Sequence, residues 1–366
     1  MSDFRYYMPT RLYIGQNAVS HHGGSMAALG QKAMIITGRN SAKRNGSLED
    51  CIAVLQKHGV AYILFDEVEE NPSVETVERA AQIGREAGAD FCIGIGGGSP
   101  MDAAKTIGIL LKHRDKTGAD LLAPSPALDS VPLAAIPTTA GTGSETTPYA
   151  ILTISAKNTK QSLPHELFYD VAFLDAGYML HMPRAVTSST AIDALTHLIE
   201  SYLCRKANFM SDKLCEAGFA MFAQCRDALR EFQLDFALRE KLLLMSALGG
   251  LCIAQTGTSL PHGMGYALTM RKNAPHGAAN GVLTAAYLRR CQPEKVAEML
   301  SLSGFASVDA LDAYIKAAIP LNYRLTEDEI ALYADIMMEN TAKLAAHPYP
   351  VTREDIADMY RESFAG

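Results

Sequence analysis

Four residues in the second half of the chain have the side-chain types and spacing of a metal site. Asp193 and His197 are four residues apart, which places a carboxylate and an imidazole on one face of a helix. His262 and His276 each follow a proline and precede a glycine, a pattern typical of tight loops. Together they offer four N/O ligands for a divalent metal such as Fe(II) or Zn(II), with a fifth position open for a substrate oxygen or water. Taken singly, a helical Asp–His pair is more often a hydrogen bond and a lone histidine more often structural.

Glu200 lies seven residues after Asp193, on the same predicted helical face. Two roles fit this position. The carboxylate could hydrogen-bond a metal-binding histidine and orient its ring, or it could form an ordinary salt bridge on the helix surface. The salt bridge is the commoner role for a helical glutamate, so the pattern favours it.

Two glycine-containing loops have the composition of phosphate-binding loops. The run Gly96-Gly97-Gly98-Ser99 follows a predicted strand and precedes a predicted helix. Glycines let the backbone approach a pyrophosphate closely, and a helix N-terminus offers free N–H groups. A tight turn without a ligand is the alternative, but three consecutive glycines are costly for a turn alone. The loop at 137–145, rich in Thr and Gly, also follows a strand, and two such loops at one sheet edge predict a bound dinucleotide.

The segment after the first predicted strand bears on the choice of dinucleotide. An acidic residue there would bind the adenosine 2′-hydroxyl of NAD(H). The sequence instead offers Arg39, Lys43 and Arg44, with no carboxylate among them. Cations suit a 2′-phosphate, so the segment favours NADP(H) over NAD(H), unless these residues form only a solvated turn.

The first half of the chain supplies elements that would position these loops. Short apolar runs at 33–37, 61–65, 91–95 and 133–136 alternate with helical patterns at 51–58, 74–87 and 102–111. This alternation predicts a doubly wound, Rossmann-like parallel sheet. Ligands of such sheets bind beyond the carboxyl ends of the strands. The loops that start at Gly38, Gly96 and Pro137 should therefore converge.

The second half has mostly helical periodicity, with helices predicted at 192–203, 211–232 and 236–254. We place the boundary at Pro183-Arg184. Residues 1–183 are predicted to form an α/β dinucleotide-binding domain. Residues 184–366 are predicted to form an all-helical metal-binding and catalytic domain.

Composition limits the functional classes. The 366 residues carry a net charge of −7, which argues against uniform binding to nucleic acid or anionic lipid. The seven cysteines form no CxxC pair, as expected of reduced thiols in a cytosol. The longest apolar run, 242–254, is too short to span a bilayer, and the N-terminus lacks the apolar core of a signal peptide. We expect a cytoplasmic protein with neither nucleic-acid nor membrane partners.

These motifs together resemble the iron-containing (group III) alcohol dehydrogenase family, and the resemblance covers the whole chain. It rests on the segments 9–15, 71–72, 96–105 (GGGSxxDxAK), 137–145, 171–176 and 193–200 (DAxxHxxE), and on the pair His262 and His276. The family fold is a Rossmann-like N-terminal domain with an all-α C-terminal domain. The resemblance thus implies the same division of the chain.

The resemblance also implies the site residues. The metal ligands would be Asp193, His197, His262 and His276. The cofactor contacts would be Gly38, Ser41, Lys43, Asn71, Gly97, Gly98, Ser99, Asp102, Thr138, Thr139, Thr142 and Lys160. Members with glycine at the Gly38 position tend towards NADP, in agreement with the charge argument.

One position departs from the family pattern. Many members carry a second histidine four residues after the third ligand, thought to relay a proton, and this chain has Tyr266 there. A phenol can pass a proton, but its ordinary pKa of about 10 matches neutral pH less well than that of imidazole. Water or a cofactor ribose hydroxyl is the alternative relay. Tyr266 and His276 are the predicted catalytic residues.

The predicted function is that of a metal-dependent, NAD(P)-linked alcohol dehydrogenase or aldehyde reductase. Its substrates would be small alcohols, diols or aldehydes, its metal Fe(II) or alternatively Zn(II), and its assembly a homodimer or higher homo-oligomer. A dehydroquinate-synthase-like or glycerol-dehydrogenase-like enzyme is the alternative on the same fold. The first of these needs several Lys or Arg around a phosphorylated acid, and residues 255–266 contain neither.

Overall fold

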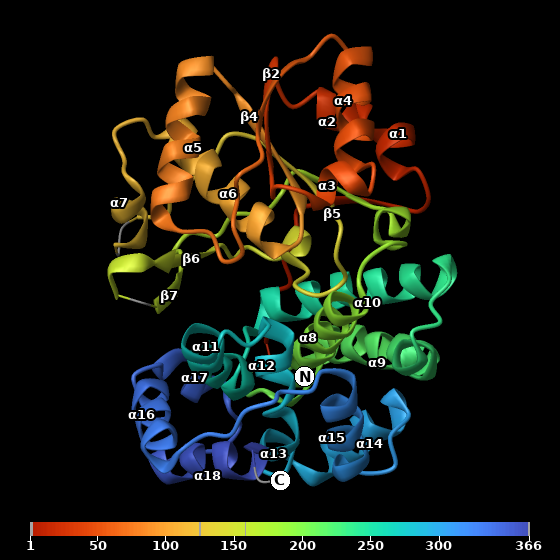
Figure 1. Cartoon of the computed structure of the whole chain (residues 1–366), viewed down its shortest axis with the longest axis vertical. Coiled ribbons are helices and arrows are strands. Elements are labelled where there is room, and N and C mark those ends of the chain that lie inside the picture. The colour runs from red at the N-terminus through yellow and green to blue at the C-terminus, as the bar shows by residue number, and fades with distance from the viewer. Residues whose placement is uncertain (1–2, 124–125, 158, 365–366) are drawn as a thin grey trace. The chain divides into compact units, whose positions relative to one another are not determined.

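A computed structural model describes residues 3–123, 126–157 and 159–364, which form two compact units (Figure 1). The sheet unit consists of Met8–Thr139 and Gly143–Met182. The helical unit consists of Met1–Tyr7, Ala140–Thr142 and Pro183–Gly366. The predicted domains, 1–183 and 184–366, remain a prediction, because contacts alone do not show which segments fold independently.

The sheet unit is built on six parallel strands, which confirms the predicted fold class. In spatial order they are β1 (Arg11–Ile14), β8 (Val171–Leu174), β5 (Leu133–Pro137), β4 (Phe91–Gly96), β2 (Lys32–Thr37) and β3 (Ala61–Phe65). The order reverses between β2 and β4, because β3 lies on one side of β2 and every later strand lies on the other. Such a reversal is where ligands bind in open α/β sheets.

Helices cover both faces of this sheet, so its central strands are apolar along their whole length. Figure 1 shows α5 (Val74–Ala87) and α6 (Gly98–Lys112) on one face, and α1 (Ala18–His22) and α4 (Ser47–Lys57) on the other. The unit also contains α2 (Gly24–Ala27), α3 (Ser41–Arg44), α7 (Gly118–Leu122) and the antiparallel pair β6 (Ile151–Ile154) and β7 (Thr159–Ser162).

Helix α6 begins earlier than predicted. The sequence pattern placed its start at residue 102, whereas the structure places it at Gly98. Glycine and proline are poor helix formers in general, which hid the first turn. Pro100 nevertheless fits there, because the first N–H groups of a helix have no intrahelical partner to lose.

The helical unit surrounds α8 (Arg184–Leu203), which packs on α9 (Phe209–Glu231), α10 (Phe236–Thr256) and α12 (His276–Gly281). The remaining helices are α11 (Leu260–Lys272), α13 (Thr284–Leu288), α14 (Pro293–Ser303), α15 (Val308–Ala318), α16 (Glu327–Met338), α17 (Thr341–Ala346) and α18 (Arg353–Phe364). Nearly every residue of α8 from Thr187 onward is buried. Polar side chains on α8 therefore need partners inside the protein.

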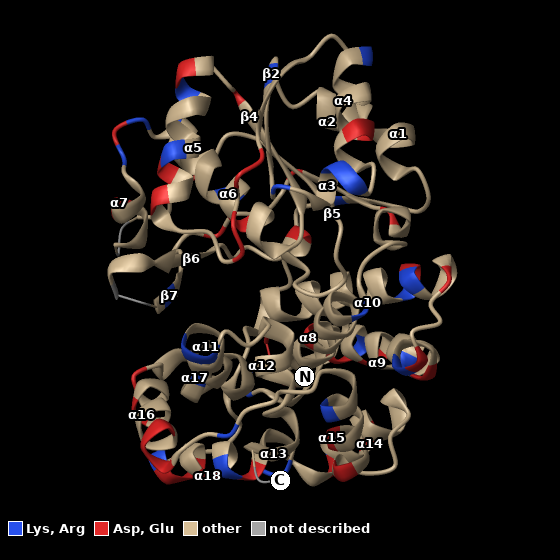
Figure 2. Ribbon diagram, in the orientation of Figure 1, with Lys and Arg blue, Asp and Glu red and all other residues tan. Residues whose placement is uncertain are grey.

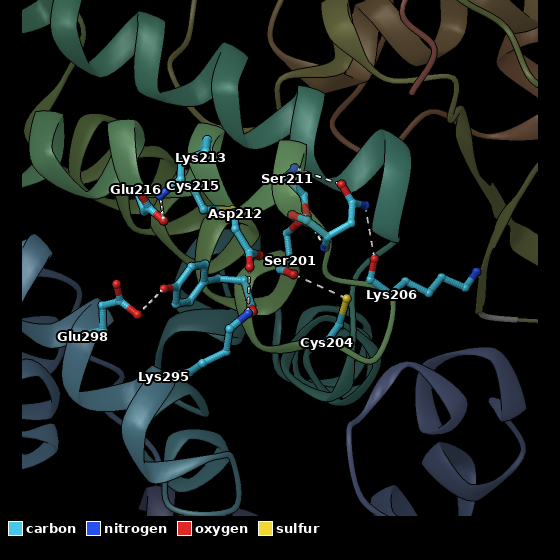
Figure 3. A network of polar contacts seen from close by, with 12 residues as sticks. Ser201, Cys204, Lys206, Ser211, Asp212, Lys213, Cys215, Glu216, Lys295 and Glu298 are labelled. Atoms are coloured by element: carbon cyan, nitrogen blue, oxygen red, sulfur yellow. Dashed lines mark hydrogen bonds and ion pairs between the residues drawn. The ribbon is translucent and has the colours of Figure 1, made fainter. Parts of the chain in front are cut away.

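A polar network holds the C-terminal end of α8 against α9 and α14 (Figure 3). Lys295 Nζ on α14 donates hydrogen bonds to the Tyr202 backbone carbonyl at 2.8 Å and to Asp212 Oδ2 at 3.0 Å. The Tyr202 hydroxyl donates a hydrogen bond to Glu298 Oε2 at 2.7 Å. The ammonium also lies 4.3 Å from the centre of the Tyr202 ring. These contacts fix the end of the helix that carries Asp193, His197 and Glu200.

Charges of both signs are mixed along the outer helices, as Figure 2 shows for α9 and α18. Within the described residues, no helix combines the length and the hydrophobicity needed to cross a membrane.

Candidate active site

Three of the four predicted metal ligands meet in the helical unit. One ligand atom each from Asp193, His262 and His276 lie within 4.8 Å of one another. Asp193 Oδ1 is 3.5 Å from His262 Nε2 and 3.8 Å from His276 Nε2. The side chains of Asp193 and His262 are almost completely buried, whereas that of His276 is 28% exposed. Of the three side chains, only that of His276 is thus partly open to solvent.

His197 lies beside this cluster but does not belong to the three-residue group. Its ring stacks on that of His262 with centroids 4.5 Å apart. Burial lowers the pKa of His197 to about 4, although the Asp193 carboxylate opposes this shift. The imidazole is therefore neutral at pH 7, the state in which it can bind a metal. Its Nδ1 is buried and makes no hydrogen bond to any described residue.

Glu200 orients His262, which corrects the predicted helix salt bridge. Its Oε1 accepts a hydrogen bond from His262 Nδ1, and its Oε2 accepts one from the Ser259 backbone N–H. The salt bridge was wrong because it assumed an exposed face, whereas Glu200 is 0% exposed. With Nδ1 committed to Glu200, Nε2, the atom that faces Asp193, is the nitrogen that would offer its lone pair to a metal ion.

The charges of this group reinforce one another. Burial alone would lower the pKa of His262, but the Glu200 and Asp193 carboxylates outweigh it and raise the pKa to about 9. Burial alone would raise the pKa of Asp193, but the surrounding histidines lower it well below its ordinary range. Without another cation, His262 thus carries the positive charge that balances the carboxylates.

His262 and His276 lie in helices, not in the predicted tight loops. His262 is in the first turns of α11 and His276 is the first residue of α12. The Pro-His-Gly pattern marks helix starts here, because Pro261 lies in the first turn of α11, where proline is well tolerated, and Pro275 directly precedes α12. Gly277 has a separate function. A Cβ atom there would overlap the Ser189 backbone carbonyl and lie 3.0 Å from Asp193 Cβ, so only glycine lets α12 approach α8 this closely.

Asn280 is a site residue that the sequence analysis missed. Its Nδ2 lies 3.0 Å from Asp193 Oδ1 and 3.1 Å from His276 Nε2, within hydrogen-bonding distance of both. It is fully buried. Its spacing of four residues from His276, on one helix face, was the available signal.

The predicted catalytic residues Tyr266 and His276 are neighbours. Their rings are nearly parallel, with centroids 6.3 Å apart. Tyr266 is half-buried, on α11 one turn after His262. This placement puts a phenol at the edge of the cluster, while its role as a proton relay remains a prediction.

The cluster has the properties that a divalent metal requires. Its nitrogen and carboxylate donors suit Fe(II) or Zn(II). His262 Nε2 is buried and has no hydrogen-bond partner among the described residues, and a buried polar atom without a partner is uncommon unless a ligand completes it. The residues present therefore fit a metal ion.

In the sheet unit, the strand ends bring most of the predicted cofactor residues together. Gly96 ends β4 and pairs with Pro137 at the end of β5, and the Thr138 N–H donates to Gly96 O at 2.8 Å. Gly96 has φ +145°, which side chains rarely allow, and a Cβ on Gly97 would lie 3.1 Å from Thr139 Oγ1. Gly98 then begins α6. A glycine loop thus meets a helix N-terminus beside the point where the strand order reverses.

Asn71, Ser99 and Lys160 form a second part of this site. The Asn71 N–H donates to Ser99 Oγ at 3.0 Å, and Lys160 Nζ donates to Asn71 Oδ1 at 2.7 Å. Lys160 comes from β7 and Asn71 from the segment before α5. Three residues far apart in the sequence thus lie beside the first turn of α6.

Asp102 is held by protein contacts. It accepts hydrogen bonds from Ser144 Oγ at 2.8 Å and the Ile151 N–H at 3.1 Å. Nearby, the buried Lys105 ammonium donates to the carbonyl oxygens of Ser144, Thr147 and Tyr149. This lysine fixes the loop that follows β5.

Thr142 differs from the other predicted cofactor residues, because the segment Ala140–Thr142 belongs to the helical unit.

The segment after β2 does have a carboxylate partner. Lys43 on α3 forms an ion pair with Asp66, which directly follows β3. The sequence analysis missed it because the two residues are 23 positions apart and meet only through the pairing of β2 with β3. Gly38 directly follows β2, and Ser41 is the first residue of α3. Both residues therefore lie close to the C-terminal end of β2.

Comparison with known proteins defines the class. A family model for iron-containing alcohol dehydrogenase matches residues 9–176, and the model for the C-terminal part of Fe-containing alcohol dehydrogenases matches residues 187–364. The structure of an iron-containing alcohol dehydrogenase from Thermotoga maritima is 35% identical, covers 100% of both chains and has a TM-score of 0.92.

Two curated relatives are similar over most of their length. Lactaldehyde reductase from Escherichia coli is 30% identical, over 91% of this chain and 92% of its own. NADPH-dependent butanol dehydrogenase from Clostridium saccharobutylicum is 28% identical, over 99% and 98%. The chain is an oxidoreductase of the metal-dependent, NAD(P)-linked kind that interconverts alcohols and aldehydes. It belongs to the iron-containing alcohol dehydrogenase family.

Proposed function

We propose that the chain interconverts small alcohols or diols and the corresponding aldehydes, with Asp193, His197, His262 and His276 as the metal ligands. The observation that carries this proposal is the buried cluster in which Glu200 fixes the tautomer of His262. A bound divalent metal supplies Lewis-acid polarisation of a carbonyl oxygen, and the nicotinamide supplies or accepts the hydride.

The residues of the cluster have separate tasks in this proposal. Asp193 supplies negative charge, and Glu200 and Asn280 hold the rings of His262 and His276 in place. The burial of Asp193 and His262 limits the access of water, which strengthens electrostatic interactions at the site. We assign Tyr266 Oη the role of passing a proton to or from the substrate oxygen, because its ring lies against that of His276.

We assign cofactor binding to the loops at the strand ends. The close approach of Gly97 to Thr139 and the hydrogen bond from Asn71 to Ser99 support a pyrophosphate site at the start of α6. NADP(H) stays our preferred cofactor because Lys43, with Arg39 and Arg44, supplies positive charge after β2. Asp66 competes for the Lys43 ammonium, so this preference should be moderate.

Fe(II) is the metal we propose. Zn(II) generally binds N/O sites more tightly than Fe(II), so it is the expected competitor.

We also propose that the protein is cytoplasmic and forms a homodimer or higher homo-oligomer. The seven cysteines are free and buried, which suits a reducing compartment. β1 is an edge strand with an exposed Ile14, and unpaired edges favour pairing with another chain.

The test is metal reconstitution. Chelation and dialysis should abolish aldehyde-dependent oxidation of NADPH or NADH, and anaerobic Fe(II) should restore it. His262→Ala should lose both metal binding and turnover, whereas His181→Ala, at an exposed position in the sheet unit, should lose neither. Full activity of the metal-free protein would refute the proposal, as would a cofactor that cycles without net consumption.

A further inference from the structure

Lys343 is a half-buried lysine next to the candidate metal ligands that the proposed chemistry does not use. It lies on α17, which packs on α11. A Cβ atom on Gly263 would lie 3.2 Å from Lys343 Cβ, and Gly263 directly follows His262. The Lys343 ammonium donates a hydrogen bond to Thr258 Oγ1. The side chain therefore runs along the start of the helix that carries His262.

The ammonium forms no ion pair with the described residues. Its one hydrogen bond goes to the neutral hydroxyl of Thr258, and no carboxylate of residues 3–123, 126–157 and 159–364 forms an ion pair with it. Burial lowers the pKa of Lys343, and the Glu200 carboxylate opposes the shift without cancelling it. Glu200 already accepts hydrogen bonds from His262 and Ser259. A buried cation in this state normally has a partner.

Lys105, which is fully buried, shows what a completed lysine site looks like. Lys105 Nζ donates to three backbone carbonyls and lies near the Asp102 and Glu145 carboxylates. An ammonium has three donors, and Lys105 satisfies all of them within the protein. Lys343 uses one. What is missing at Lys343 is an acceptor with negative charge.

We propose that Lys343 binds an oxyanion on the substrate, so that the preferred substrate is a short aldehyde or alcohol carrying a carboxylate, sulfonate or phosphate. This inference rests on the proposed function. The ammonium and the ring of His262 both interact with the Glu200 carboxylate, so a molecule held by Lys343 lies near the cluster. A buried positive charge also selects against neutral aldehydes, which would leave it unpaired.

The test compares two aldehydes with the same carbonyl chain, one anionic and one neutral. Succinic semialdehyde and its methyl ester share the carbonyl and the chain, but only the first is an anion. Wild-type kcat/KM should favour the anion by about 10- to 100-fold, the usual effect of a charge-assisted hydrogen bond. Lys343→Met should remove this preference and Lys343→Arg should retain most of it. Lys316→Met, an ion-paired lysine on α15, should leave the preference unchanged.

Further aldehydes identify the anion. Glyoxylate and 5-oxopentanoate vary the distance between carbonyl and carboxylate, and sulfoacetaldehyde and glyceraldehyde 3-phosphate vary the headgroup. For at least one of these anionic aldehydes, kcat/KM should fall in Lys343→Met as it is expected to fall for succinic semialdehyde. Equal losses for charged and neutral aldehydes in Lys343→Met would mean a structural role and overturn the proposal. A raised KM for NADH or NADPH with unchanged aldehyde preference would also overturn it, because the anion would then be a cofactor phosphate.

A binding measurement separates this inference from the proposed reaction. Succinate should raise the Tm of metal-free wild type and of Lys343→Arg, but not of Lys343→Met. If no aldehyde reacts while succinate acts through Lys343, the anion site stands and the proposed reaction fails. If neutral aldehydes react as well as anions and succinate has no effect, the anion site fails and the proposed reaction stands.

Discussion

Glu200 accepts a hydrogen bond from Nδ1 of His262, and both side chains are buried in the helical unit. This contact leaves Nε2 of His262 as the nitrogen that faces Asp193. A carboxylate that holds a histidine in this way fixes its tautomer and raises its basicity. Glu200 therefore supports the candidate metal cluster through His262.

Glu200→Gln should weaken metal binding by about 10- to 100-fold, the usual effect of removing such a partner. The amide keeps the size of the carboxylate but loses its charge and cannot stabilise His262 in the same way. Chelator competition with Zn(II) measures the effect. Glu298→Gln, which changes the acceptor of the Tyr202 hydroxyl, is the matched control and should bind Zn(II) as wild type does. Equal affinities of Glu200→Gln and wild type would contradict the assignment.

Gly277→Ala should separate α12 from α8. The added Cβ would lie 2.8 Å from Ser189 C and 3.0 Å from Asp193 Cβ, so the backbone must move. Overpacking of this kind costs about 1–3 kcal/mol, and the shift should also displace His276 from Asp193. Thermal unfolding and Zn(II) affinity should therefore both fall. Gly24→Ala on α2, whose Cβ would meet only the His58 ring at 3.4 Å, should change neither.

The central strands could be predicted because burial on both faces leaves an apolar run in the sequence. β1 carried no such signal, since it is four residues long and its ends are exposed. The spacing of Asp193 and His197 likewise followed from helix geometry. The meeting of His262 and His276 with Asp193 depends on how α11 and α12 pack against α8, which no local pattern contains.

Glu200 illustrates the limit of local reasoning. Its spacing placed it on the right helical face, but a sequence does not show whether that face is exposed. Because α8 is buried almost all round, the carboxylate meets a histidine from another helix and not a basic residue at the surface. Lys43 and Asp66 repeat this lesson, since their ion pair depends on strand pairing between distant segments.

The ion pair of Lys43 predicts how cofactor preference responds to mutation. Lys43→Ala should lower the ratio of kcat/KM for NADPH to that for NADH by about 2- to 5-fold, a modest effect because exposed charges are screened. Asp66→Asn should raise the ratio, since it frees the ammonium for a 2′-phosphate. Steady-state kinetics with both cofactors measures the ratio, and Lys57→Ala on α4 is the control. A ratio unmoved by either variant would remove Lys43 from the cofactor site.

Glu145 makes stability depend on pH. The side chain is buried, and desolvation raises its pKa from 4.5 to about 7, with Lys105 opposing the shift. Between these values the unfolded chain loses the proton and the folded chain retains it, so the wild type loses stability as pH rises through this window. Above about pH 7 both states are ionised and the loss is complete.

Glu145→Gln removes this titration while keeping the shape of the side chain. The Tm of the variant minus the Tm of the wild type should therefore increase from pH 5 to pH 8. Over the whole window, a pKa shift of this size corresponds to a change of about 3 kcal/mol in the difference between their free energies of unfolding. For the control Glu67→Gln, at an exposed position, the Tm difference from wild type should be the same at both pH values. Thermal unfolding of the metal-free proteins at both pH values measures it. A difference that stays constant or shrinks towards pH 8 would mean that Glu145 is already ionised in the folded protein at low pH.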